Sequence, residues 1–218
     1  MKAFLADVAA QLPLLEPIVE IGARPAEGQE DLADLRSLFA GREYLACDLQ
    51  DGPGIDRIED IHDLSFSDGS IGTVIAADTL EHVADPLRAL REVHRVLKPG
   101  GTVAITSVMF FVIHAHPWDY WRFTPEGFEQ LLAPFDDRLV TAHGWEHLPE
   151  TVLGLGRKAP IDRPLELDRL PQTAALVRSW GEGHGVDLGP IRMTVPQLWR
   201  FTGRQTVAAV RRRLGGSR

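Results

Sequence analysis

Short apolar segments alternate with helical patterns along the first 160 residues of the chain. Short apolar runs are typical of buried strands, and apolar positions at helical spacing are typical of amphipathic helices. On this basis strands are predicted at residues 17–22, 43–48, 55–61, 74–77, 102–106, 139–142 and 151–157, and helices at 2–12, 30–40, 86–98, 125–132, 171–181 and 196–214. Alternating strands and helices predict an α/β fold with a mostly parallel sheet.

The most informative stretch is residues 74–106, which predicts a strand, a polar loop, a helix and a second strand. Asp85 offers an acceptor for the helix N-terminus, and Pro86 suits the first helical position. Pro99-Gly100-Gly101 is predicted to end the helix before the second strand begins. Ligands of open parallel sheets bind beyond the carboxyl ends of the strands, so the loop 78–82 is a candidate part of a binding site.

Acids and a glycine at predicted strand ends are candidates for binding a nucleotide. Glu20 and Gly22 end the first strand, where the backbone of such folds approaches the ligand. Asp48 ends the second strand, where a carboxylate can accept hydrogen bonds from both ribose hydroxyls. The alternative for Asp48 is a surface aspartate that starts a turn. Asp78 ends the fourth strand and is expected to line the same pocket.

Histidines and aromatic residues after the fourth and fifth strands are candidates for substrate chemistry. Imidazole titrates near neutral pH, so His82 is a candidate to take a substrate proton, although capping or packing is the alternative role. His116 and Asp119 are further candidate bases. Trp118, Tyr120 and Arg122 are candidate substrate contacts, because aromatic rings cover apolar groups and a guanidinium pairs with an anion. The alternative is an aromatic plug that packs the sheet end.

The spacing of His114 and His116 would put both imidazoles on one side of an extended segment, and Asp119 follows them. Such a set can bind iron or zinc. The sequence offers no further ligands in support, and we therefore predict no metal.

Three motifs carry a family resemblance. Leu80-Glu81-His82-Val83, Asp85-Pro86 and the later Leu97-Lys98-Pro99-Gly100-Gly101 closely resemble the fourth-strand region of class I S-adenosylmethionine-dependent methyltransferases. Glu20-Ile21-Gly22 resembles the first motif of that superfamily, although Ala23-Arg24-Pro25 stands where further glycines usually follow. The segment from Asp119 to Pro125 is similar to one in small methyltransferase-like proteins encoded near glycosyltransferases. The resemblance covers about residues 17–157.

The resemblance implies a three-layer α/β sandwich with a Rossmann-like, seven-stranded, mostly parallel sheet and S-adenosyl-L-methionine as cofactor. It also implies that Asp60 contacts the adenine amino group and that the backbone of Ile61 contacts the adenine ring. We accordingly expect residues 1–160 to form a methyltransferase-like domain and residues 161–218 to form a helical C-terminal extension.

Charge is distributed unevenly along the chain. The net charge is −8, and no acid follows Asp187, so the last residues are basic and the body is strongly acidic. This acidic body argues against nucleic-acid binding. The predicted helix 196–214 has an apolar stripe, which we expect to dock onto protein, in the same chain or as a homodimer contact, before lipid. With no bilayer-spanning run and an acid too early for a signal peptide, a cytoplasmic protein is predicted.

The expected function is methyl transfer to an oxygen or nitrogen atom of a small molecule, such as a sugar or glycoconjugate. Two alternatives come from other classes. The altered glycine loop favours a catalytically inactive methyltransferase-like binding or scaffold protein. An enzyme of the same fold with non-methyl chemistry is the other alternative. The single cysteine excludes an intrachain disulfide.

Overall fold

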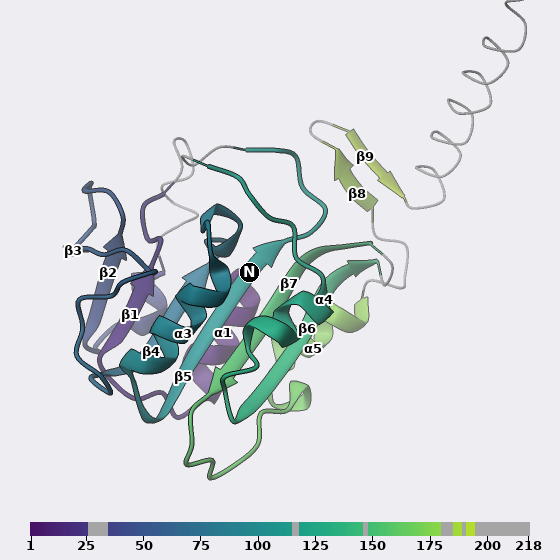
Figure 1. Cartoon of the computed structure of the whole chain (residues 1–218). Helices are drawn as coiled ribbons and strands as arrows, with labels where there is room; N and C mark the ends of the chain where they lie inside the picture. The colour runs from purple at the N-terminus through teal and green to yellow at the C-terminus, as the bar shows by residue number, and fades with distance from the viewer. Residues whose placement is uncertain (26–34, 115–117, 146–147, 180–184, 189–190, 195–218) are drawn as a thin grey trace, which may run out of the picture. The chain divides into compact units, whose positions relative to one another are not determined.

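The computed structural model describes residues 1–25, 35–114, 118–145, 148–179, 185–188 and 191–194 (Figure 1). The chain divides into two compact units, Met1–Val177 and Arg178–Arg218. The predicted boundary at residue 160 lies within the first unit. The predicted helix 196–214 lies outside the described residues.

The first unit is built on a seven-stranded sheet in the order β3-β2-β1-β4-β5-β7-β6. Neighbours from β3 to β5 pair in parallel, and β7 runs antiparallel to both β5 and β6. The strands are β1 (Ile18–Ile21), β2 (Tyr44–Asp48), β3 (Arg57–Ile58), β4 (Ile71–Ala77), β5 (Leu97–Val108), β6 (Asp137–Trp145) and β7 (Leu148–Arg157). This confirms the predicted seven-stranded, mostly parallel α/β fold.

Helices cover both faces of the sheet, as Figure 1 shows. On one face α3 (Pro86–Val96) and α4 (Pro125–Leu131) pack on strand residues such as Val74 and Val103. On the other face α1 (Lys2–Gln11) packs on Ile75 and its neighbours. Successive residues of one strand thus enter different cores, because side chains alternate across a sheet. The result is the predicted three-layer sandwich.

The two predicted proline-started helices begin where the sequence indicates. The Asp85 side chain accepts a hydrogen bond from the Arg88 amide at 2.9 Å, and Thr124 accepts one from the Gly127 amide at 3.1 Å. Each cap satisfies an amide that the first helical turn leaves without a partner. These caps fix where α3 and α4 start, and therefore where the loops before them end.

The prediction that the fifth strand begins at residue 102 is wrong. Helix α3 does end before the Pro-Gly-Gly sequence, but β5 already begins at Leu97 and runs through Pro99-Gly100-Gly101. Ile71 pairs with Leu97 and Thr73 with Thr102, so β5 contains extra residues opposite β4. Glycine suits this irregularity, because a β-carbon at Gly101 would lie 2.8 Å from the Lys98 carbonyl oxygen.

Three further differences concern short elements. Of the predicted helix 30–40, residues 30–34 lie outside the described part, and the rest forms a 3₁₀ helix, Arg36–Phe39. The predicted strand 55–61 is reduced to the two residues of β3. The extension was predicted to be helical, yet beyond α5 (Pro171–Ser179) it contains an antiparallel hairpin, β8 (Gly185–Leu188) and β9 (Ile191–Thr194). Among the described residues no helix has the length and hydropathy needed to cross a bilayer.

Candidate functional site

The carboxyl ends of β1 and β4 meet at the point where the strand order reverses, since β1 leads to β2 on one side and β4 leads to β5 on the other. Ligands of open α/β sheets bind at such a point. The loops at this edge form two groups. The β1–β2 side comprises residues 22–24 and 48–50. The β4–β5 side comprises residues 78–84, 109–114 and 118–123.

Gly22 joins the two sides by direct packing. Its φ is +78°, and a β-carbon there would lie 2.5 Å from the Thr79 hydroxyl oxygen. The Thr79 hydroxyl in turn lies 3.1 Å from the Ile21 carbonyl oxygen, as its donor. A left-handed backbone and the absence of a side chain are both properties of glycine. Gly22 therefore lets the end of β1 approach the loop after β4.

Asp48 organises the β1–β2 side. Its carboxylate accepts hydrogen bonds from the amides of Arg24 and Gln50, each at 3.0 Å. The Gly22 amide donates to the Cys47 carbonyl at 2.9 Å, so the loop after β1 is fixed to the end of β2. A carboxylate has about four acceptor sites, and two remain here after these bonds. They are of the kind that ribose hydroxyls need.

The other predicted cofactor residues lie in different surroundings. Glu20 is buried in β1, where its carboxylate accepts a hydrogen bond from the Tyr44 hydroxyl. Asp60 is half exposed beside His62, and its neighbour Ile61 is buried. Burial alone would raise the pKa of Asp60, but hydrogen bonds from the His62 amide and ring outweigh it and lower the pKa. Asp78 has a φ of 50° and accepts a hydrogen bond from the Thr106 hydroxyl at 2.6 Å.

Glu81 is the residue that the sequence analysis missed. It lies in the 3₁₀ helix Leu80–His82 with no solvent exposure. One carboxylate oxygen accepts a hydrogen bond from the Ser107 hydroxyl at 2.6 Å, and the other has no hydrogen-bond partner among the described residues. Burial raises the pKa of Glu81 to about 7. The signal in the sequence was an acid inside the apolar environment of Leu80 and Val83.

His82 and His114 lie edge to face, with ring centroids 4.8 Å apart. His82 comes from the loop after β4, and His114 comes from the loop after β5. The Nδ1 atom of His82 contacts the Trp118 carbonyl, and that of His114 lies 3.2 Å from the Val112 carbonyl. A carbonyl only accepts, so each Nδ1 carries the hydrogen and each Nε2 keeps its lone pair.

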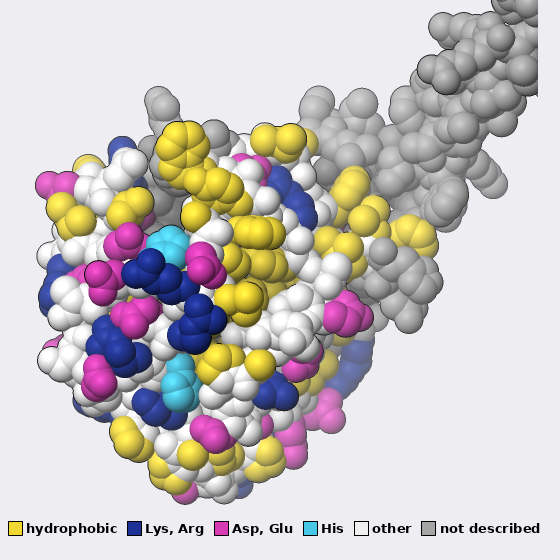
Figure 2. Space-filling view, viewed as in Figure 1, with side chains coloured by type: hydrophobic (Ala, Val, Ile, Leu, Met, Phe, Trp, Pro, Cys, Tyr) yellow, Lys and Arg dark blue, Asp and Glu magenta, His cyan; other side chains and the backbone are white. Residues whose placement is uncertain are grey.

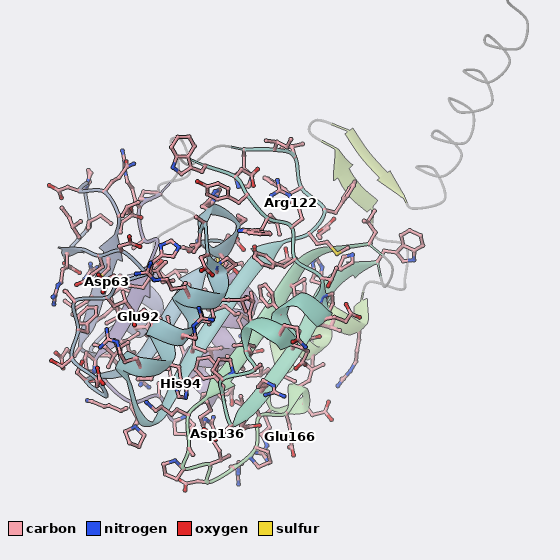
Figure 3. All side chains as sticks on the ribbon, viewed as in Figure 1. Asp63, Glu92, His94, Arg122, Asp136 and Glu166 are labelled. Carbon is pink, nitrogen blue, oxygen red and sulfur yellow. The ribbon has the colours of Figure 1, made fainter. Side chains whose placement is uncertain are left out.

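Asp119 is held by Arg122 through two hydrogen bonds, from Nη1 at 2.5 Å and from Nη2 at 2.8 Å. The Asp119 side chain is 4% exposed and also accepts the His114 amide at 2.7 Å. The guanidinium holds the pKa of Asp119 well below its usual range. Because such a carboxylate is a weak proton acceptor, this ion pair is suited to shaping the loop rather than to removing a proton. Figure 3 shows Arg122 on this loop.

Apolar side chains are exposed on the same loop. Figure 2 shows hydrophobic groups gathered near the top of the view, where the chain after β5 lies. The exposed members of this loop are Phe111, Val112, Ile113, Trp118, Tyr120 and Trp121. Trp121 is also tied down, because its ring N–H donates to the Val83 carbonyl at 2.8 Å. His116, a predicted base in this loop, lies outside the described residues.

Comparisons with known proteins agree with this arrangement. A family model described as a methyltransferase domain matches residues 33–105. A demethylmenaquinone methyltransferase from Clavibacter sepedonicus is 35% identical over 128 residues, which cover 52% of this chain and 50% of that protein. A ubiquinone/menaquinone biosynthesis C-methyltransferase from Geotalea daltonii is 26% identical over 115 residues, which cover 52% of this chain and 46% of that protein. The chain thus spans about half the length of these two relatives.

A solved structure from Thermotoga maritima, described as an S-adenosylmethionine-dependent methyltransferase and possible histamine N-methyltransferase, has the same fold. It is 19% identical with a TM-score of 0.54, and the alignment covers 72% of this chain and 89% of that one. The sheet order and this structural match show that the chain has the fold of S-adenosylmethionine-dependent methyltransferases. Residues 33–105 are therefore similar in sequence to methyltransferase domains, and the chain shares the fold of the Thermotoga maritima structure.

Proposed function

We propose that the chain transfers the methyl group of S-adenosylmethionine to a small-molecule acceptor, with the cofactor on the β1–β2 side and the acceptor on the β4–β5 side. The observation that carries this proposal is the contact between Gly22 and Thr79 at the point where the strand order reverses. It makes one continuous edge from the Asp48 carboxylate to the His82 imidazole.

The cofactor would supply an activated methyl group on a sulfonium. In our proposal Asp48 accepts hydrogen bonds from the ribose hydroxyls, and Asp78 and the backbone at Gly22 line the rest of the cofactor. Glu20 supports this surface from within β1 through Tyr44. Asp60 and Ile61 remain the proposed contacts to the adenine.

Methyl transfer breaks the carbon–sulfur bond as the acceptor atom bonds to the methyl carbon, leaving S-adenosylhomocysteine. An oxygen or nitrogen acceptor must also lose a proton, and we assign its removal to the Nε2 lone pair of His82. His116 stays an alternative base. We no longer favour Asp119, because Arg122 already occupies both of its oxygens. The exposed rings of Trp118 and Tyr120 would cover the acceptor, and Arg122 would act by holding their loop.

The exposed aromatic and apolar side chains of the loop after β5 fit two classes of acceptor. A sugar or glycoconjugate would stack on aromatic rings and offer a hydroxyl. A ring compound of quinone type is the second candidate, because two relatives are named for quinone methylation and the loop exposes Phe111, Val112 and Ile113. An apolar acceptor would bury these side chains.

Calorimetry with S-adenosylmethionine tests the cofactor assignment. Asp48→Ala should weaken binding at least about tenfold, since hydrogen bonds to a charged group contribute roughly 1.5–3 kcal/mol. Asp51→Ala is the matched control, because Asp51 lies in the same turn and bonds only the adjacent Gly52 amide among the described contacts. Equal binding by both variants would rule out the ribose role. A labelled methyl group followed into sugar and quinone acceptors would then separate the two acceptor classes.

A further inference from the structure

Three side chains with metal-binding atoms converge on the β4–β5 side. Glu81 and His82 come from the 3₁₀ helix after β4, and His114 comes from the loop after β5. One carboxylate oxygen and two imidazole nitrogens lie within 4.8 Å of one another. We propose that Glu81, His82 and His114 bind a divalent transition-metal ion, Zn²⁺ or Fe²⁺.

The first support comes from the orientation of the two histidines. The Nδ1–H of His82 contacts the Trp118 carbonyl, and the Nδ1–H of His114 lies against the Val112 carbonyl and 3.3 Å from the Asp119 carboxylate. Metal-binding histidines commonly donate their second N–H to a carbonyl or carboxylate in this way, which fixes the ring and the tautomer. Coordination by each ring would then be through its other nitrogen, Nε2.

The second support is the buried carboxylate of Glu81. Its side chain has no solvent exposure, and Ser107 satisfies only one of its two oxygens. Within the described part of the chain the other oxygen has no hydrogen-bond partner. A buried acceptor without a partner is costly, and native structures rarely keep one without a reason. A cation bound at this oxygen would provide the missing partner.

The donor set selects the kind of metal. Two imidazoles and one carboxylate are typical of zinc and non-haem iron sites, whereas magnesium and calcium prefer oxygen ligands. Ligand atoms about 2.0–2.2 Å from a tetrahedral ion lie roughly 3.3–3.6 Å apart. The present separations, up to 4.8 Å, therefore require a contraction of up to about 1.2–1.5 Å, which rotation of the two part-exposed histidines can supply.

This set differs from the one that the sequence suggested. Asp119 pairs with Arg122 and orients His114, so it supports a ligand instead of being one. Glu81 takes its place. Three protein ligands leave a coordination position open, and a hydroxyl bound there has a lowered pKa. Only this last step rests on the proposed methyl transfer, in which the ion would replace His82 in activating the acceptor and the hydroxyl proton would pass to solvent water.

The test uses untagged, full-length protein that has been stripped of metal with a chelator and dialysed. Co²⁺ is titrated in the absence of S-adenosylmethionine, and its visible absorption reports coordination by nitrogen and oxygen ligands. Wild type should bind one equivalent. Glu81→Gln and His114→Gln should each lower the affinity about 100-fold or more, since even residues that only support a ligand cost 10–100-fold.

His94→Gln is the matched control, because His94, labelled in Figure 3, lies on α3 outside the cluster and packs edge to face with Phe135. It should bind Co²⁺ as wild type does. Circular dichroism and S-adenosylmethionine binding by the same samples would show that the variants are folded. No stoichiometric binding by wild type, or unchanged binding by both cluster variants, would overturn the metal site. Co²⁺ binding without any S-adenosylmethionine binding would overturn the proposed function and leave the metal site standing.

Discussion

Asp48 on the β1–β2 side and Glu81 on the β4–β5 side both follow strands of the same sheet, yet their carboxylates are held in different ways. Asp48 is part-exposed and accepts two backbone amides from its own neighbourhood. Glu81 is fully buried and accepts one side-chain hydroxyl from the neighbouring strand. Burial raises the pKa of the Glu81 carboxyl to about 7.

The loops on the two sides are also held in place by different kinds of contact. On the β1–β2 side backbone amides donate to the Asp48 carboxylate and to the Cys47 carbonyl, so its shape depends on glycine and on tight turns. The β4–β5 side is held by side chains: the Asp119–Arg122 pair, the Trp121 ring and the His82 contact with Trp118. A backbone scaffold suits a constant ligand such as a cofactor. Side-chain scaffolds change readily between proteins, which suits a variable acceptor.

The largest effect is expected where the two sides touch. Gly22→Ala should lower the free energy of unfolding by about 3 kcal/mol, because it combines a φ of +78° with a β-carbon 2.5 Å from the Thr79 hydroxyl oxygen. Urea unfolding of Gly22→Ala, Thr79→Ala and the double variant measures this. The double variant should recover part of the loss, since only the overlap is relieved. Strictly additive losses would show that the contact does not limit the approach of the two loops.

The next largest effect is expected on the rate of methyl transfer. His82→Gln should lower kcat about 100-fold while leaving S-adenosylmethionine binding nearly unchanged, because His82 belongs to the β4–β5 side. His94→Gln, with a histidine on α3, should leave both quantities unchanged. Single-turnover rates and calorimetry on the same preparations measure the two effects. If His82→Gln lowered cofactor binding as much as the rate, the assignment of cofactor binding to the β1–β2 side alone would be wrong.

The β1–β2 side was largely predictable from the sequence because its key residues stand at the ends of strands. A strand that ends at Gly22, and an acid that ends the next strand, are visible in the order of residues. The same holds for the caps at Asp85 and Thr124, which fix α3 and α4. The start of β5 was mispredicted, because pairing with β4 overrides the turn preference of Pro99-Gly100-Gly101.

The β4–β5 side was less predictable, because the state of each acid depends on residues far along the chain. Asp119 looked like a base, but its pairing with Arg122 and its burial follow only from the folded loop. Glu81 received no separate role from the sequence, and its hydrogen bond with Ser107 depends on the register of β4 and β5. The sequence identifies the acids on this side, but the pKa of each one depends on the tertiary packing around it.

The ion pair on the β4–β5 side should contribute more than an exposed one. Arg122→Ala should lower the free energy of unfolding by about 2 kcal/mol, because it leaves the Asp119 carboxylate 4% exposed without its two charged donors. Arg91→Ala, at an exposed position of α3, should change it by no more than about 0.5 kcal/mol. Urea unfolding compares the two. A similar small loss for both would mean that the loop keeps its shape without the pair.

The smallest effect on stability is expected at Trp118, and it distinguishes a substrate contact from a structural one. Trp118 is 61% exposed and holds His82 only through its backbone carbonyl, which Trp118→Ala retains. That variant should change the free energy of unfolding by less than about 0.5 kcal/mol, yet weaken acceptor binding about three- to tenfold through loss of a stacking ring.

Trp121→Ala is the matched comparison, because its ring N–H donates to the Val83 carbonyl. It should cost about 1–2 kcal/mol of stability through the lost hydrogen bond and packing. Thermal unfolding and KM for the acceptor measure both variants. If Trp118→Ala destabilised the protein as much as Trp121→Ala and left KM unchanged, the aromatic loop would be a plug for the sheet end, and the acceptor would have to be sought elsewhere on the edge.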